Sequence, residues 1–333
     1  MKYPSPYLLQ SALHQVLFFS LSLQIVYREA KLIFPTDSTF CFAKRLLTVF
    51  WCFPFLRQAS AWLESANNPL LARELMHMPK IREYLYRPYV NRYWKPAKRL
   101  AVIEEHYGLV NNNASFLDLA PDEYIDLLVF NLGFDKLRVV LDRPSWMRRE
   151  GEIGLSLFLG INRIYTVMFL LSGSPGNMKL IVGSVQGTHI KPAQNEYKLL
   201  TKTLYGIRPR DFLIHITKMI SDELGCTEIL GVSDAAHRSS HLFSRANKHI
   251  SYNAIWLEHG GEKSGKDFFK LVPKFIKRKD TNIAARKRAL YRRRYQFLDE
   301  LRLLLKWIVA SPPPKKVHLR ICESQVTNVT FGN

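Results

Sequence analysis

The chain has 333 residues, 47% of them hydrophobic, and a formal net charge of +20. This apolar content is enough for a sizeable core, so the sequence argues against a disordered chain and predicts one large domain or two smaller ones. The basic excess favours an anionic partner: nucleic acid, a phosphorylated ligand or an acidic lipid surface.

Missing motifs exclude several kinds of site. The sequence has no Gly-x-Gly-x-x-Gly, Walker-type or His-Glu-x-x-His pattern, which argues against the nucleotide and zinc sites that use them. Its four cysteines are scattered without the spacing of a metal site. We therefore expect reduced thiols, a cytoplasmic location and no bound metal.

Residues 1–115 are predicted to form a helical N-terminal region. Tyr7–Val26 is rich in Leu and Phe, but its glutamines and His14 make it a poor membrane span. Lys2 is its only early charge and no small-residue cleavage site follows, which argues against a signal peptide. We expect an amphipathic helix packed on the body, with contact to lipid, peripheral to the inner membrane, as the alternative. A second dense apolar run, Phe40–Leu56, follows.

Residues 116–275 are predicted to form a mixed-sheet α+β core. Short apolar runs separated by turn signals indicate an antiparallel meander. An amphipathic helix then opens at Asp211, ends at Gly225 and leads to a further strand. The predicted strands are residues 137–141, 153–159, 165–171, 180–186, 228–232 and 268–273.

Residues 276–310 are predicted to form a long basic helix, and residues 311–333 a tail. Half of the net charge lies in residues 270–306, which hold 13 Lys or Arg against three acidic residues. Successive residues of a helix are about 100° apart, so most of its arginines cannot lie beside the apolar stripe and must point to water or to a partner. We expect an anionic membrane before nucleic acid, because no aromatic stacking platform accompanies the arginines. The predicted stripe is Leu290, Phe297, Leu301, Leu304 and Ile308.

Polar residues gather just beyond the strand at 228–232. A nucleophilic role for Ser233 is disfavoured because no Gly-x-Ser-x-Gly elbow surrounds it. Helix capping by Ser233 or Asp234 is the structural alternative. His237 is a candidate general base or substrate-binding donor. The catalytic candidates are His237, Ser233, Asp234 and Glu258.

Two further groups are candidates for binding. Arg208 and Arg210 flank a proline just before a helix, where guanidinium groups beside free backbone donors suit phosphate; a solvated loop is the alternative. A polar and aromatic cluster follows later in the chain, for which core packing is the alternative. The substrate-binding candidates are His106, Tyr252, Asn253 and Trp256.

Several short motifs follow one another in a fixed order: Arg87-Pro-Tyr89, His106-Tyr107, Ile181-Val-Gly-Ser-Val-Gln-Gly187, Tyr205-Gly-Ile-Arg-Pro-Arg210, Val232-Ser-Asp234 with His237, Tyr252-Asn-Ala-Ile-Trp256 with Gly260-Gly261, and Lys287-Arg-Ala-Leu-Tyr-Arg-Arg-Arg-Tyr295. Their order and spacing resemble the VirK/YbjX family of enterobacterial virulence-associated proteins. The resemblance implies a role at the cell envelope, in virulence and in withstanding cationic antimicrobial peptides.

Residues 137–232 also resemble, more loosely, the acyl-CoA N-acyltransferase fold, in which a meander leads to a strand, a pyrophosphate-binding loop and helix, and a neighbouring strand that splays away. The resemblance implies a phosphorylated acyl donor such as acyl-CoA. The Arg/Gln-x-x-Gly-x-Gly/Ala loop of those enzymes is missing here. The residues assigned to the donor are Gln186, Gly187, Gly206, Arg208 and Arg210.

Two functions remain open from the sequence. The first is an acyltransferase acting on an envelope component or protein, which requires a deep pocket at the edge formed by residues 187–237. The second is a non-enzymatic module that binds anionic lipid, RNA or protein through its basic surface, which requires that edge closed and the basic helix exposed. The oligomeric state is left open.

Overall fold

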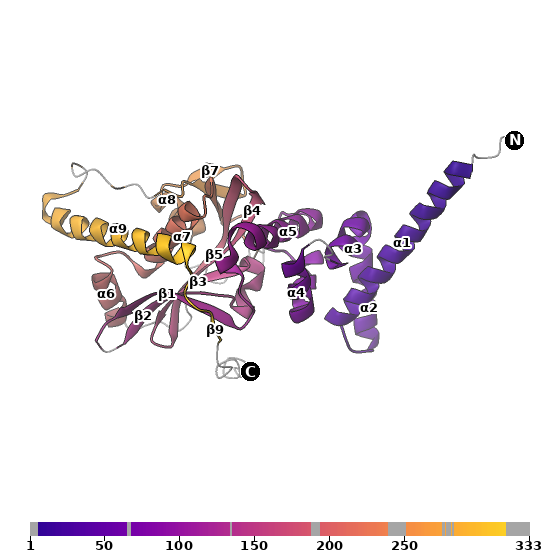
Figure 1. Cartoon of the computed structure of the whole chain (residues 1–333), viewed down its shortest axis with the longest axis horizontal. Coiled ribbons are helices and arrows are strands. Elements are labelled where there is room, and N and C mark those ends of the chain that lie inside the picture. Colours follow the sequence, from indigo (N-terminus) through magenta and orange to yellow (C-terminus); the bar gives the residue numbers. More distant parts are fainter. Residues whose placement is uncertain are drawn as a thin grey trace, which may run out of the picture.

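The computed structural model describes residues 6–64, 68–133, 135–187, 194–238, 251–274, 277, 281 and 283–317. Helices from the first third of the chain stand at one end of an elongated molecule, and a large sheet with its covering helices forms the rest (Figure 1). The predicted α+β class, with a mainly antiparallel sheet and a long C-terminal helix, is confirmed.

The described residues contain one sheet of nine strands in the order β7-β8-β6-β5-β4-β3-β2-β1-β9. Every neighbouring pair is antiparallel except β5 and β6, which run parallel. A helical crossover connects β5 to β6, as a parallel pair of strands requires. The strands are β1 (Glu123–Asn131), β2 (Lys136–Asp142), β3 (Ile153–Leu159), β4 (Asn162–Ser174), β5 (Asn177–Gly187), β6 (Glu228–Val232), β7 (Glu262–Ser264), β8 (Phe268–Leu271) and β9 (Lys316–Val317).

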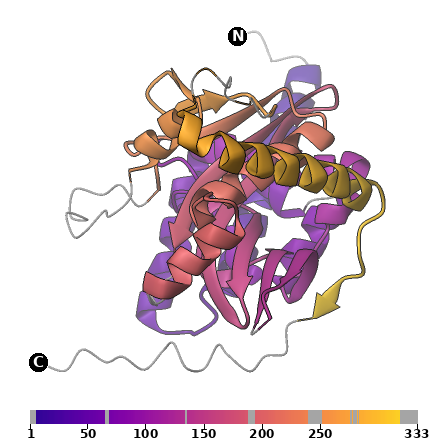
Figure 2. The ribbon, with the colours of Figure 1, turned by 90° about the vertical axis from the view of Figure 1, so that its left-hand side faces the viewer.

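Helices cover both faces of the central strands, which explains why those strands are nearly continuous apolar runs. On one face, α7 (Pro209–Glu223) packs against β3, β4 and β5, and α9 (Arg288–Ala310) packs on α7. Figure 2 shows α9 crossing in front of the sheet. On the other face, α5 (Pro96–Asn113) packs on β4. Two shorter helices, α6 (Gln194–Thr203) and α8 (Tyr252–Glu258), lie on either side of α7 in the chain.

The N-terminal helices form a second core. In α1 (Pro6–Ile33), buried Ile25, Val26 and Ala30 belong to the half that packs on α2 and α3. Ser38 and Asn68 cap α2 and α4 through side-chain oxygens that accept backbone N–H bonds. The remaining helices here are α2 (Thr39–Cys52), η1 (Phe53–Phe55), α3 (Leu56–Glu64), α4 (Pro69–His77) and η2 (Pro79–Leu85). The short 3-10 helices described outside this region are η3 (Ser115–Leu117), η4 (Ser145–Glu150) and η6 (Ala285–Lys287).

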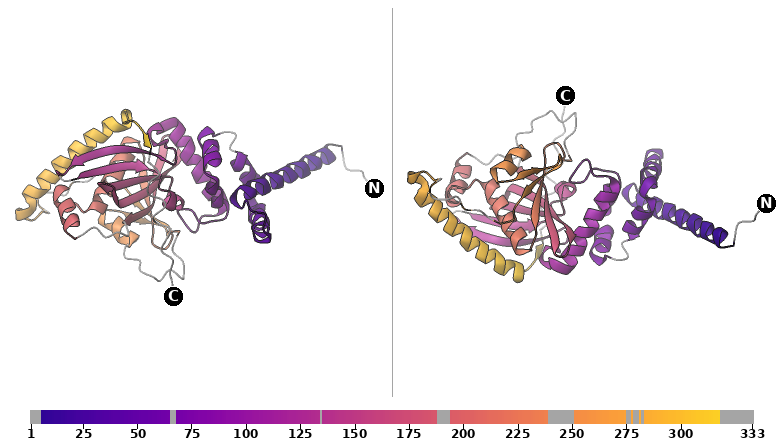
Figure 3. Two further views of the ribbon diagram at one scale, coloured as in Figure 1. Left: turned by 90° about the horizontal axis from the view of Figure 1, so that it is seen from below. Right: turned by 90° about the horizontal axis from the view of Figure 1, so that it is seen from above.

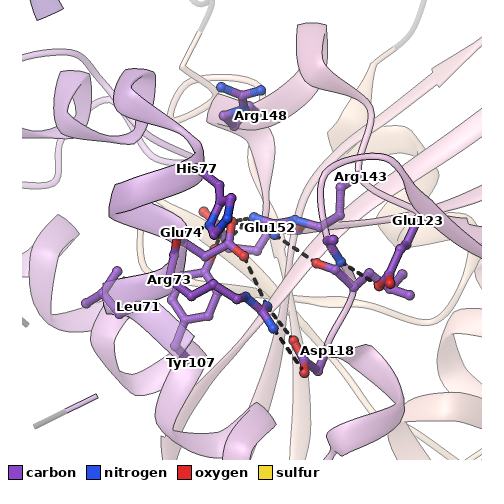
Figure 4. A network of polar contacts seen from close by, with 12 residues as sticks. Leu71, Arg73, Glu74, His77, Tyr107, Asp118, Glu123, Arg143, Arg148 and Glu152 are labelled. Atoms are coloured by element: carbon purple, nitrogen blue, oxygen red, sulfur yellow. Dashed lines mark hydrogen bonds and ion pairs between the residues drawn. The ribbon is translucent and has the colours of Figure 1, made fainter. Parts of the chain in front are cut away.

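A buried ion-pair network joins these helices to the sheet (Figure 4). Arg143, at the end of β2, contacts Glu74 of α4 at 2.7 Å and Glu152 beside β3 at 3.3 Å. The Tyr107 hydroxyl donates to Glu152 and accepts from Arg143. Tyr89 donates to the other oxygen of Glu152 at 2.8 Å. Each charge is therefore buried together with opposite charges and hydrogen bonds.

The predicted apolar stripe of the C-terminal helix is partly wrong. Leu290 and Leu304 are 39% and 47% exposed, whereas Leu298 and Leu305 are buried with Leu301 and Ile308. Two stripes of helical spacing overlap in this leucine-rich sequence, and packing on α7 selects the one that starts at Leu298.

Candidate functional site

The two parallel strands separate at the edge where the sequence places the site. The pairing of β5 with β6 runs from Lys179–Glu228 to Val182–Gly231, and β5 then continues to Gly187 without a β6 partner. Polar side chains from four segments meet beyond this point, as the crevice outside the ends of parallel strands allows.

Ser233 and Asp234 act here as caps. The Ser233 hydroxyl donates to the Lys266 carbonyl at 2.8 Å and accepts the N–H of Ala236. The Asp234 carboxylate accepts the backbone N–H groups of Tyr252 and Asn253 at the start of α8, whose N-cap residue is Ser251. Both side chains are therefore committed to structural hydrogen bonds, which is the capping alternative raised by the sequence.

His237 and Tyr252 form a stacked pair at the same edge. Their ring centres are 4.8 Å apart with planes at 26°, and both side chains are buried. Asn253 joins this group, because its side-chain oxygen accepts the N–H of Asp234 at 3.0 Å. Of the predicted residues, the structure brings together at this edge His237, Ser233, Asp234, Tyr252, Asn253 and, through Glu150, Gln186.

Glu150 and Arg238 complete the edge and were missed by the sequence reasoning. The Glu150 carboxylate, whose side chain is 2% exposed, pairs with Arg238 at 2.5 Å and accepts a hydrogen bond from Gln186 at 2.5 Å. A Cβ at Gly183 would collide with the Glu150 carbonyl, so the glycine lets β5 approach this segment. No local motif connects these residues, because Glu150 and Arg238 are 88 positions apart.

Arg208 and Arg210 lie at the N-terminus of α7, but their charges are already matched. Both donate to Glu258, at 2.7 and 2.6 Å, and both donate to Asp211 in the first turn of α7. Burial opposes ionisation of Asp211, yet hydrogen bonds from His259 and Arg208 and the charge of Arg210 hold its pKa well below the usual range. An ionised carboxylate therefore occupies the helix terminus that a pyrophosphate would need.

The remaining predicted residues lie apart from this edge or in the core. His106 is 1% exposed and accepts the Leu171 N–H, and burial lowers its pKa to about 3. Trp256 packs against Gly231 and donates to the Val232 carbonyl. Gly206 lines an open groove of about 500 Å³ between α6 and the start of α9. Gly187 packs beside the Tyr165 ring.

Among the described residues, no three His, Cys, Asp or Glu side chains are grouped to hold a metal ion. The charged groups of the edge pair with each other instead. The edge therefore offers hydrogen-bonding groups and the charges of guanidinium and carboxylate side chains.

A second candidate surface lies on the N-terminal helices. Thirteen large apolar side chains of α1, α2 and η1 are 40–72% exposed, and we call twelve of them, all except Leu32, the apolar platform. The stretch Thr39–Glu64 is long and apolar enough to cross a membrane by length and composition, with 22% of its most apolar window buried. The platform consists of Val16, Leu17, Phe18, Phe19, Leu21, Phe40, Phe42, Leu46, Leu47, Phe50, Trp51 and Phe53.

A third surface is the exposed basic face at the start of α9. Figure 3 places this helix and the projecting α1 at opposite ends of the molecule. Arg294 is directed inward and donates to the Tyr205 carbonyl at 3.0 Å, so it is not part of the free face. The exposed members are Arg286, Lys287, Arg288, Arg292 and Arg293.

Comparison with known proteins gives a family but no activity. A family model described as a protein of unknown function (DUF535) matches residues 41–306. The uncharacterized protein YbjX of Escherichia coli is 25% identical over 256 residues, which cover 74% of this chain and 77% of YbjX. Two uncharacterized proteins of Haemophilus influenzae are 35% and 30% identical over 126 and 135 residues, covering 38% and 40% of this chain and 42% and 45% of their own lengths. No solved structure matches.

Proposed function

The chain belongs to the DUF535 family and is similar to YbjX. From the apolar platform, we propose that it is a peripheral membrane protein that binds anionic lipid. The observation that carries this proposal is the exposure of the platform. Large exposed apolar patches of this kind mark interaction surfaces. The proposed setting is the one that the family resemblance implies, the cell envelope and its resistance to cationic antimicrobial peptides.

The charges around the platform favour anionic lipid over a protein partner. Residues 14–57 carry five Lys or Arg and two acidic residues. Glu29 is buried against Arg82, and Asp37 is paired with Arg45. The free charges next to the apolar side chains are therefore cationic, and each contributes about 1 kcal/mol near an anionic bilayer.

Cationic side chains lie directly against aromatic members of the platform. Lys44 lies over the Phe40 ring at 4.0 Å, and Arg57 over the Phe18 ring at 5.3 Å. Aromatic rings with basic groups at their margin are typical of the interface between hydrocarbon and headgroups.

The apolar contribution exceeds the electrostatic one. Complete burial of a large apolar side chain is worth about 1.5–3 kcal/mol, so a side chain that gains half of its burial in lipid contributes about 1 kcal/mol. The seven platform residues of α2 and η1 would together contribute about 7 kcal/mol on this scale. Binding should therefore weaken only partly when salt screens the charges.

Co-sedimentation with vesicles tests this proposal. The double variant Phe50→Ser/Trp51→Ser should bind anionic vesicles at least about tenfold more weakly, from the loss of about 1 kcal/mol per side chain. The matched control is Leu303→Ser/Trp307→Ser, which removes exposed apolar residues of α9 (63% and 75% exposed). Unchanged binding by the platform variant, or equal losses in both variants, would contradict the proposal.

Acyl transfer is a second candidate function, and it is favoured by one observation. The only parallel pair of the described sheet separates beyond Val182–Gly231, and α7 lies between its strands in the chain, the order that the acyltransferase resemblance implies. The matched charges at Arg208 and Arg210 count against it. Calorimetric titration of the wild type with acyl-CoA decides: if binding occurs, Arg208→Ala/Arg210→Ala should weaken it, and absence of binding removes this candidate.

A further inference from the structure

A cluster of arginines lies where the N-terminal helices meet the sheet edge. Three segments far apart in the sequence are joined there by backbone contacts. The N–H of Val90 donates to the Arg149 carbonyl, and the N–H of Arg92 donates to the Ala236 carbonyl, both at 2.8 Å. Asn91 forms a β-bridge with His237. This arrangement places Arg87, Arg149 and Arg238 around one region, which we call the arginine junction.

The backbone of the junction is held in an unfavourable conformation. Val90 has a φ of 54°, in the left-handed region, although its side chain is β-branched. Such a conformation is strained and persists only where the surrounding structure enforces it. Its consequence here is that the chain reverses between Arg87 and Asn91 and contacts both other segments.

The charges of the junction are only partly compensated. Arg87 pairs with Glu83 at 3.2 Å, and Arg238 pairs with buried Glu150 at 2.5 Å. Arg149 is half-buried and forms no ion pair among the described residues; the carboxylate that acts on its charge, Glu83, already pairs with Arg87. Burial, together with the positive charges of Arg238 and Arg87, lowers the pKa of Arg149. Three guanidinium groups thus share two carboxylates, those of Glu83 and Glu150.

Arg238 also has an unused donor. Its Nε–H is buried and has no acceptor among the described residues, although its Nη2 group is bonded to Glu150. Leaving a buried N–H without an acceptor is unfavourable. An anion in contact with Arg149 and this N–H would satisfy both groups.

We infer that the arginine junction is a binding site for a phosphate group, with Arg149 as its principal contact. Several planar guanidinium groups with donors in different directions match the oxygens of a phosphate better than the two oxygens of a carboxylate. The phosphate belongs either to a soluble phosphomonoester or to a lipid headgroup. The second source is within structural reach of the platform, because Tyr86, next to Arg87, contacts the Phe34 ring just after α1. The inference does not depend on membrane binding.

The test is a calorimetric titration of the full chain with inorganic phosphate. Ionic strength is held constant, and chloride is the reference anion. The substitution Arg149→Gln breaks no ion pair among the described residues and should raise the Kd for phosphate by about 10- to 100-fold, the loss expected for a charged hydrogen bond. Arg292→Gln, an exposed arginine of α9, makes the same change in charge and should leave the Kd within about twofold.

A second arm identifies the source of the phosphate. Binding of both variants is compared on vesicles that contain phosphatidic acid or phosphatidylglycerol at equal surface charge. A loss by Arg149→Gln on phosphatidic acid alone assigns a lipid phosphomonoester, and a loss only with dissolved phosphate assigns a soluble ligand. No phosphate binding by the wild type in either arm, or equal effects of Arg149→Gln and Arg292→Gln, would overturn the inference.

Discussion

Replacing Arg143 by Met should lower the free energy of unfolding by more than the loss of an exposed ion pair would. The Arg143 side chain is 5% exposed, and its two partners, Glu74 and Glu152, are 1% and 0% exposed. Its guanidinium also donates to the carbonyls of Leu119 and Glu152 at 3.0 and 3.2 Å. The substitution therefore removes the cation shared by two buried carboxylates and leaves two carbonyls without this donor.

The expected loss in the free energy of unfolding is about 3–5 kcal/mol, the range for breaking a buried pair by removing one partner. Glu74 retains Arg73 at 3.1 Å and Glu152 retains two tyrosine hydroxyls, which keeps the loss from being larger. Adding Glu152→Gln to Arg143→Met should recover about 1–3 kcal/mol, because it removes one of the two uncompensated charges.

Urea unfolding followed by circular dichroism measures these values. The control is Arg138→Met, because Arg138 pairs with Asp126 at 3.1 Å but is 24% exposed. That variant should lose no more than about 1 kcal/mol. If Arg143→Met loses no more stability than Arg138→Met, the buried network does not stabilise the junction between the helices and the sheet.

The other predictions concern pH, capping and backbone packing. Burial lowers the pKa of His106 from 6.5 to about 3, so the unfolded chain takes up this proton first and stability falls as pH drops from about 6.5 towards 3. The loss of unfolding free energy due to His106 should reach about 2 kcal/mol at pH 5. It should be absent in His106→Asn, whose side-chain oxygen can still accept the Leu171 N–H. Chemical unfolding at pH values from 7 to 5 measures this difference. Asp234→Ala should lower stability by about 1–2 kcal/mol through loss of its two hydrogen bonds to the first N–H groups of α8, whereas Asp122→Ala in an exposed turn should not, as thermal unfolding would show. Gly183→Ala should cost more than about 2 kcal/mol because its methyl group would collide with the Glu150 carbonyl, while Gly108→Ala, with open space on α5, should be neutral or stabilising in the same urea assay.

The central strands could be predicted from sequence because burial on both faces makes them short apolar runs. The predicted strands at 153–159 and 228–232 agree with β3 and β6 at both ends. Gly225 also ends α7 as predicted, with a φ of 72°. Strand β1 was missed because acidic residues and half-buried positions interrupt its apolar pattern, and β9 because it is two exposed residues.

It was harder to predict which residues pair with one another at the site, because the paired residues are distant in sequence. Arg208 was placed correctly before a helix, but Arg210 lies in its first turn because α7 begins at Pro209, two residues before the predicted start at Asp211. Glu258, which binds both arginines, is 48 and 50 residues away and had been assigned to catalysis. A local pattern can place a guanidinium at a helix terminus, but only the fold shows whether its charge is already used.

We propose membrane binding through α1 and α2 rather than through α9 because the two surfaces differ in kind. The five exposed basic residues at the start of α9 contribute about 1 kcal/mol each near an anionic bilayer, and salt screens that attraction. The platform combines a similar basic margin with apolar side chains whose transfer into lipid does not depend on ionic strength. Since α9 and α1 lie at opposite ends of the long axis, insertion of the platform does not require α9 to reach the same surface. A bilayer that holds the protein at high salt must therefore do so through α1 and α2.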